Sequence, residues 1–230
     1  MTVLALRLAA PLQSWGASSR FVRRYTQMEP TKSGIVGLIA AAQGRRRTDP
    51  IEDLVQLRLG VRADQPGRLV RDFQTARPET GKPLPLSYRF YLGDAVFLAV
   101  IEAAAELLEG IDESLRNPAF PLYLGRRACP PTGPVSLGLR DGSIQQALEA
   151  EPWLASPWHR KQHRYESRVT LTTVFDCAPG TPGAETVRDE PVTFDPIRRE
   201  YHWRSVGRGH AVVGNPDAVP PVDKHDPMTA

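Results

Sequence analysis

The chain has 230 residues, of which 41% are hydrophobic and 24% charged, and its formal net charge is +3. These values are ordinary for a folded globular protein, and no apolar run approaches the ~18 residues that a membrane-spanning helix needs. The two cysteines, Cys129 and Cys177, form no CxxC motif. We therefore expect a cytoplasmic protein with packed thiols, without a disulfide and without a membrane partner.

Positive charge is concentrated at the start of the chain. Residues 1–47 contain eight basic residues and one acid, whereas residues 101–114 contain five acids and no base. Arginine supplies 25 of the 29 cations, and its planar guanidinium suits phosphates and stacked bases, although a GC-rich genome would produce the same bias. The segregation of charge along the chain predicts a polyanion bound on one face.

The first half of the chain alternates between strand-like and helix-like patterns. Residues 2–10 predict a strand, and an apolar stripe from Ile35 to Ala42 predicts a helix with Thr31 as its N-cap. The alternating runs 54–64 and 67–76 are joined by DQPG and predict a hairpin.

A polar, proline-bearing insertion at residues 76–87 follows, then one buried strand over residues 88–103 and a second helix that ends before Pro118. This order predicts an α+β fold, in which an RRM- or ferredoxin-like antiparallel sheet carries helices on one face and leaves the other face free to bind. We expect this domain to span residues 1–120, a β-rich C-terminal elaboration packed on it to span 121–208, and a mobile tail to span 209–230.

The segment PTKSG places a lysine at the start of the first helix, where the helix dipole is already positive. A nucleotide-binding P-loop is excluded, because Thr26 and Thr31 occupy the positions of its two required glycines. Free backbone N–H groups, Lys32 and Ser33 could still hold one phosphate oxygen. The alternative is a plain capped helix.

Two loops carry further candidate RNA contacts. Trp15 lies beside amide and guanidinium side chains, so it could stack on a base, or it could fill the core beneath its loop. Arg126 and Arg127 lie in a loop framed by glycine and proline, where they could clamp a nucleic-acid backbone or remain an exposed charge pair.

The segment HRKQHRYE spaces His159 and His163 four residues apart, but no third metal ligand lies at a convincing spacing. We expect a solvated basic stretch and no metal or other cofactor. An alternative is that His163 and Tyr165 act as acid and base in metal-independent RNA cleavage, in which the 2′-hydroxyl is the nucleophile. No Ser/His/Asp arrangement or carboxylate pair stands out, so the chain is expected to bind rather than catalyse.

Five segments are characteristic in combination and in order: LRLAAPLQSWG, PTKSGIVGLIAAAQGRRR, YRFYLGDAVF, PLYLGRRACPPTGPVSLG and DEPVTFDPIRREYHW. Together they resemble the CasD subunit family of the type I-E CRISPR Cascade complex, in the RAMP superfamily, over residues 3–206. The resemblance implies an RRM-like fold with a thumb hairpin inserted near residues 76–90. It also implies a non-catalytic subunit that caps the Cascade backbone and holds the five-prime handle of the crRNA in antiviral defence. The implied partners are the crRNA handle, the CasC backbone subunit, the large CasA subunit and, through the complex, target DNA.

The resemblance and the motifs above assign the handle site to these residues: Gln13, Ser14, Trp15, Gly16, Arg20, Arg24, Thr31, Lys32, Ser33, Arg89, Arg126 and Arg127. By this resemblance, Arg89 matches the position at the base of the thumb that contacts the crRNA where its handle is followed by the spacer. The alternative function is that of a metal-independent endoribonuclease that processes CRISPR repeat RNA. A third interpretation, a scaffold whose basic face contacts only protein, also remains open on the sequence alone.

Overall fold

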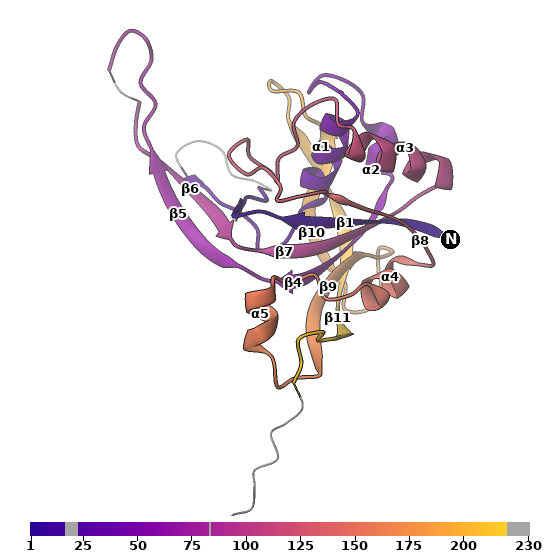
Figure 1. Cartoon of the computed structure of the whole chain (residues 1–230). Coiled ribbons are helices and arrows are strands. Elements are labelled where there is room, and N and C mark those ends of the chain that lie inside the picture. Colours follow the sequence, from indigo (N-terminus) through magenta and orange to yellow (C-terminus); the bar gives the residue numbers. More distant parts are fainter. Residues whose placement is uncertain (17–22, 83, 220–230) are drawn as a thin grey trace, which may run out of the picture.

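The fold is built around a large antiparallel sheet (Figure 1). The structure is a computed structural model, and it describes residues 1–16, 23–82 and 84–219. The seven strands lie in the order β10-β11-β9-β4-β7-β1-β8, and a four-stranded sheet of β2, β3, β5 and β6 lies beside them. The expected mixed α+β class with an antiparallel sheet is confirmed.

Four strands of the large sheet and two helices follow the β-α-β-β-α-β order of the ferredoxin-like motif. They are β1 (Thr2–Ala9), α1 (Lys32–Ala42), β4 (Arg58–Gln65), β7 (Val96–Glu102), α3 (Ala105–Arg116) and β8 (Ser136–Asp141). β7 pairs antiparallel with both β1 and β4, and β8 pairs with β1. β1 and β7 are therefore the central strands of this unit and are buried on both faces.

The second half of the chain continues the same sheet. β9 (Arg168–Asp176) pairs with β4, β11 (Glu200–Gly214) pairs with β9, and β10 (Glu185–Thr193) forms the edge. The expected tail is wrong in its first residues, because Gly209 to Gly214 belong to β11 and pair with β9 from Thr173 to Arg168. The last part of that expectation, residues 220–230, lies outside the described residues.

Helices cover both faces of the large sheet, which corrects the expectation that one face would be free. Leu4, Leu6 and Leu8 of β1 pack into the core under α1 and α3, whereas Val3 and Ala5 pack on the opposite face. α4 (Ile144–Ala150) covers that opposite face, and α5 (Pro157–Gln162) lies on the same side in Figure 1. The short α2 (Glu52–Val55) lies with α1 and α3. Over β1 and β7, the sheet therefore presents no open face on which bases could stack.

The small sheet leaves the body as a projecting ribbon. β5 (Arg68–Gln74) pairs with β6 (Ser87–Gly93) and not with β4, so the hairpin predicted around DQPG is wrong. Gly67 has φ +74°, and the chain bends there out of the large sheet. The single strand expected over residues 88–103 is likewise two strands, β6 and β7, separated at Asp94. Figure 1 shows β5 and β6 extending from the body, so the insertion begins at Arg68 rather than near residue 76.

The remaining strands of the small sheet are short. β2 (Leu12–Gln13) and β3 (Arg23–Arg24) both pair with β6. Across the described ranges, no helix has the length and apolar character needed to cross a membrane.

Candidate nucleic-acid interface

The start of α1 is occupied by acidic side chains of the same protein. The Lys32 Nζ lies 2.6 Å from the Glu190 Oε1, and the Lys32 backbone N–H donates to the Asp189 Oδ2 at 2.8 Å. Thr31 caps the helix by accepting from the Gly34 N–H at 3.2 Å. The anion that Lys32 indicated is therefore present, but it consists of the Asp189 and Glu190 carboxylates on β10 rather than a phosphate. Thr31, Lys32 and Ser33 are all buried, and their prediction as phosphate contacts is wrong for this reason.

Arg204 of β11 joins the same ionic cluster. Its guanidinium donates to both carboxylate oxygens of Asp189, at 2.6 and 2.9 Å, and also pairs with Asp176. Burial acts to lower the pKa of Arg204, but the hydrogen bonds to Asp189 and the charge of Asp176 outweigh it and raise the pKa. The cluster ties α1 to β9, β10 and β11, so its role is structural.

The first loop also points inward. Trp15 is 1% exposed, and its Nε1 donates to the Gln13 Oε1 at 3.1 Å. The Gln13 Nε2 donates in turn to the carbonyls of Leu8 and Ala95. The core alternative for Trp15 is therefore correct, and Gln13 and Ser14, which are equally buried, are not free to contact RNA. Gly16 is exposed, and Arg20 lies outside the described residues.

Arg126 and Arg127 follow Gly125, whose backbone has φ +92°. A Cβ at Gly125 would lie 1.7 Å from the carbonyl oxygen of Ser14, so only glycine allows this loop to pack against the first loop. The Arg126 guanidinium donates to the carbonyls of Phe90 (3.2 Å) and Arg24 (2.9 Å). Arg127 is exposed, with no ion-pair partner among the described residues. Arg126 thus fixes the loop, and Arg127 is the side chain it presents.

Further arginines of the small sheet lie next to this loop. Arg24 on β3 is the register partner of Arg89 on β6 in the parallel pairing of these strands. On the other side of β6, Asp72 on β5 is the register partner of Arg89. The Arg126 guanidinium lies 4.6 Å from the centre of the Tyr91 ring, on the same face of β6 as Arg89. The Nε of Arg89 is buried without a hydrogen-bond partner, which leaves a donor unsatisfied at the centre of this group. We call Arg24, Arg89, Arg126 and Arg127 the arginine cluster.

The other face of the ribbon interleaves aromatic rings with cations. Tyr25 stacks on Phe90 with ring centres 4.9 Å apart, and the Arg71 guanidinium lies 5.8 Å from the Tyr88 ring. Phe73 is 64% exposed. Sequence reasoning did not select these residues, although the alternation of GRLVRDFQ in a strand that cannot be buried is a signal for them.

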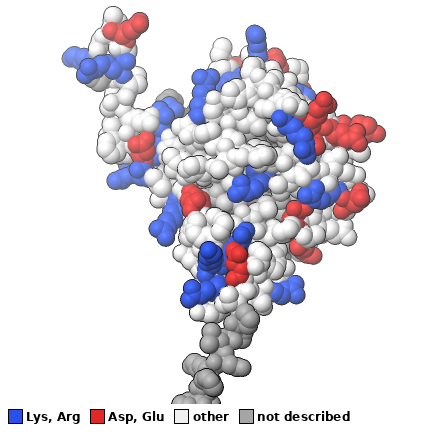
Figure 2. All heavy atoms as spheres, viewed as in Figure 1, with Lys and Arg blue, Asp and Glu red and all other residues white. Residues whose placement is uncertain are grey.

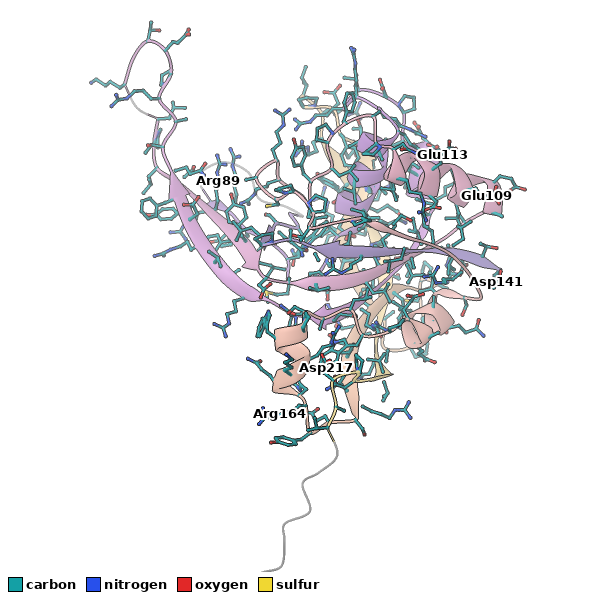
Figure 3. All side chains as sticks on the ribbon, in the orientation of Figure 1. Arg89, Glu109, Glu113, Asp141, Arg164 and Asp217 are labelled. Atoms are coloured by element: carbon teal, nitrogen blue, oxygen red, sulfur yellow. The ribbon has the colours of Figure 1, made fainter. Side chains whose placement is uncertain are left out.

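Charge is unevenly distributed over the face of the molecule that Figure 2 shows. Lysine and arginine lie along the projecting ribbon, with acids at its tip and base, and a group of acidic side chains lies at the opposite end, where Figure 3 labels Glu109 and Glu113 on α3. The ribbon side of the molecule is therefore the side suited to a polyanion.

Comparison with known proteins assigns the chain to a family. Residues 3–207 match the family of CRISPR-associated proteins designated Cas5. The chain belongs to the Cas5 family. A relative, the CRISPR system Cascade subunit CasD of Escherichia coli (strain K12), is 32% identical over 174 residues, which cover 65% of this chain and 77% of the relative.

Two solved structures are similar to this Cas5 protein. A chain of a CRISPR RNA-guided surveillance complex is 29% identical with a TM-score of 0.76, covering 96% of this chain and 95% of its own. The crystal structure of a Cas protein is 35% identical with a TM-score of 0.71, covering 95% of this chain and 100% of its own. The Cas5 fold therefore extends over nearly the whole chain, including the C-terminal strands.

The residues considered for catalysis lie elsewhere in this Cas5 protein. The His163 Nδ1 is 2.9 Å from the Glu166 Oε1, and the Tyr165 hydroxyl accepts from the Arg164 Nη2 at 3.0 Å. Both belong to the segment after α5, and Figure 3 labels Arg164 far from Arg89. Within the described residues, no group of three His, Cys, Asp or Glu side chains is arranged to hold a metal ion.

Proposed function

We propose that this Cas5 protein is a non-catalytic, crRNA-binding subunit of a Cascade-type surveillance complex and holds the five-prime handle of the crRNA on the arginine cluster. The observation that carries the proposal is the convergence of Arg24, Arg89 and Arg126 from three separate segments at β6, with the exposed Arg127 next to Arg126 in the chain. Like charges repel one another, and a bound anion would offset the repulsion among arginines that three separate segments bring together. The similarity to the Escherichia coli CasD and to a chain of an RNA-guided surveillance complex supports the identity of that anion.

The four residues of the arginine cluster have different roles in this proposal. Arg126 is held by two backbone carbonyls and a ring, so it positions the loop. Arg24 and Arg127 are exposed and contact phosphates, and the unsatisfied Nε–H of Arg89 donates to the closest phosphate oxygen. Phosphate contacts of this kind fix the register of the RNA, whereas exposed rings such as Phe73 stack on unpaired bases.

The β5–β6 ribbon is the thumb in this proposal, and the β-α-β-β-α-β unit is the RRM-like domain. Leu69 and Phe73 are 57% and 64% exposed and Leu84 is 53% exposed, which suits a ribbon that packs against a CasC-type backbone subunit. A CasA-type large subunit and, through it, target DNA are the further partners.

The test uses the complex assembled from its subunits and its crRNA. Arg127→Ala removes an exposed guanidinium without an internal bond, and Arg47→Ala is the matched control, an exposed arginine outside the cluster. We expect Arg127→Ala to weaken handle RNA binding and to reduce the log–log salt slope by about 0.7, the value for one contact to a single strand. Because a phosphate contact carries no sequence information, Arg127→Ala should weaken the binding of an RNA of equal length without the handle sequence to a similar extent, whereas Arg47→Ala should affect neither RNA.

Three outcomes would count against the proposal. If Arg127→Ala combined with Arg24→Ala leaves both affinity and salt slope unchanged, the cluster is not the handle site. If the subunit joins the complex equally well without RNA and shows no handle affinity, it is a scaffold. If purified protein cleaves repeat RNA in EDTA and His163→Ala abolishes the cleavage, it is a nuclease.

A further inference from the structure

The segment around α5 forms a second basic and aromatic surface, which the arginine cluster does not include. Trp158 is 46% exposed and Tyr165 is 65% exposed, and Lys161 and Arg164 lie exposed between them in the sequence. We call these four residues the α5 patch. Figure 3 labels Arg164 just beyond α5 and Arg89 on β6, at well separated places in the view, so the two surfaces are distinct.

The patch rests on a rigid support. The buried Trp153 donates from its Nε1 to the carbonyl of Asp64 at 2.7 Å, which fixes the segment before α5 to β4. The backbone N–H and hydroxyl of Ser156 both donate to the Gln65 Oε1, at 3.1 and 2.6 Å. On the other side, the Asn215 Nδ2 donates to the carbonyl of His163 at 2.9 Å. The backbone that carries the patch is therefore tied to the body of the protein, so little backbone entropy is lost when a ligand binds.

The aromatic side chains are layered from the core outward. His159 lies between Trp153 and Trp158, with ring centres 5.7 and 5.4 Å away and edge-to-face geometry at both contacts. This packing holds the indole of Trp158 in place while nearly half of it stays in solvent. The outermost ring is thus pre-positioned to take one further stacking partner.

The positive charge of the patch is not neutralised by its neighbours. Glu166 lies 2.9 Å from the His163 Nδ1, and Asp217 pairs with Arg160 at 2.8 Å, so both nearby acids have partners outside the patch. Lys161 has no ion-pair partner within the part of the chain that the structure describes. The Arg164 guanidinium lies 4.8 Å from the centre of the Tyr165 ring, an arrangement that keeps its charge available to solvent.

We propose that the α5 patch binds an unpaired strand of nucleic acid without sequence preference, at a site separate from the arginine cluster. Cations at intervals attract phosphates, and an exposed, fixed indole stacks on a base of any identity. Duplex DNA is a poorer ligand, because its bases already stack on one another and offer no free face to Trp158.

The test titrates the purified full-length chain into fluorescein-labelled dT20, U20 and a 20-bp duplex, by anisotropy over a series of NaCl concentrations. Trp158→Ala should weaken dT20 binding about 5- to 160-fold, the range for loss of one stacked base, with little change in salt slope. Lys161→Ala with Arg164→Ala should lower the slope by about 1.4, twice the single-strand value for one phosphate. Trp158→Phe should restore most of the affinity. Comparison of dT20 with U20 tells whether the strand is DNA or RNA.

The control is Arg46→Ala with Arg47→Ala, which removes the same charge from an exposed segment after α1. It should leave dT20 affinity within twofold of the unchanged protein. An equal loss in this control, or no loss in Trp158→Ala, would overturn the proposal. Photocrosslinking of bromodeoxyuridine-substituted dT20 to the unmodified chain gives an answer that needs no variant. Crosslinks at Trp158 or Tyr165 support the proposal, and crosslinks confined to the β5–β6 ribbon, or no binding at all, contradict it.

Discussion

The Nζ of Lys32 lies 2.6 Å from the Oε1 of Glu190, although the two residues are 158 positions apart in the chain. The pair links the first helix to the edge strand of the large sheet, and the hydrogen bond from the Lys32 N–H to Asp189 lies beside it. A helix N-terminus attracts an anion whatever its source. In this protein the source is β10, so the conspicuous PTKSG motif supports the fold rather than the RNA site.

Lys32→Ala should therefore act on stability and not on RNA binding. It leaves Glu190 and Asp176 without a cation they now share, and we expect the free energy of unfolding to fall by about 3 kcal/mol. Urea denaturation followed by circular dichroism measures this loss. Arg47→Ala serves as the control, with a change below about 0.5 kcal/mol. A Lys32→Ala protein of unchanged stability with weakened handle binding would show that the lysine reaches RNA after all.

Comparison of Gly125→Ala with Gly133→Ala should distinguish the steric clash at the Gly125 loop from the strain that a positive φ imposes on alanine. Gly125 and Gly133 have φ of +92° and +83°, but only at Gly125 would a new Cβ meet backbone, the carbonyl oxygen of Ser14 at 1.7 Å. Gly133→Ala should cost about 1–2 kcal/mol from its backbone conformation alone. Gly125→Ala should cost about 1–3 kcal/mol more and should also displace Arg126 and Arg127. Equal losses in thermal denaturation would contradict the close packing of the two loops.

The strand and helix segments were predictable, because their apolar periodicities are local properties of the sequence. The partners of the strands were not. β5 follows β4 after a short turn signal, yet it pairs with β6, because the pairing depends on a bend at Gly67 and on a second strand that begins after residue 86. Similarly, Asp94 with φ +56° divides one apolar run into two strands of different sheets.

Burial explains which predicted site residues failed. Trp15 and Lys32 have side chains that suit RNA, and nothing in their local sequence reveals that Gln13 and Glu190 satisfy them inside the protein. Arg24 and Arg89 were selected by resemblance, and their adjacency across β3 and β6 is a long-range pairing that spacing does not encode. The exposed rings of the ribbon were missed because a single apolar residue in a strand is expected to be buried.

The two thiols should react at very different rates. Cys129 is 1% exposed, and burial raises the pKa of its thiol, which lowers the fraction of reactive thiolate. Cys177 is half-buried, and both cysteines are free. With Ellman's reagent at pH 8, the native protein should show one readily reactive thiol, and the unfolded protein should show two. Cys177→Ser should remove the fast phase, and a fast phase that persists in this variant would show that the Cys129 loop opens readily.

His159 should lower the free energy of unfolding as the pH falls below 6.5. Burial, and after it the charge of His163, lower the pKa of His159 below its usual 6.5, while Asp94 acts in the opposite direction. As the pH falls through 6.5, the unfolded chain takes up this proton before the folded chain does, so the stabilising contribution present above pH 6.5 is progressively lost. His159→Phe keeps a ring between Trp153 and Trp158 but cannot titrate, and its thermal midpoint should vary less between pH 7.5 and pH 5 than that of the unchanged protein. His210→Gln, which replaces an exposed histidine on β11, is the matched control. A His159→Phe protein whose midpoint falls as steeply on acidification as the unchanged chain would assign the acid sensitivity to other groups.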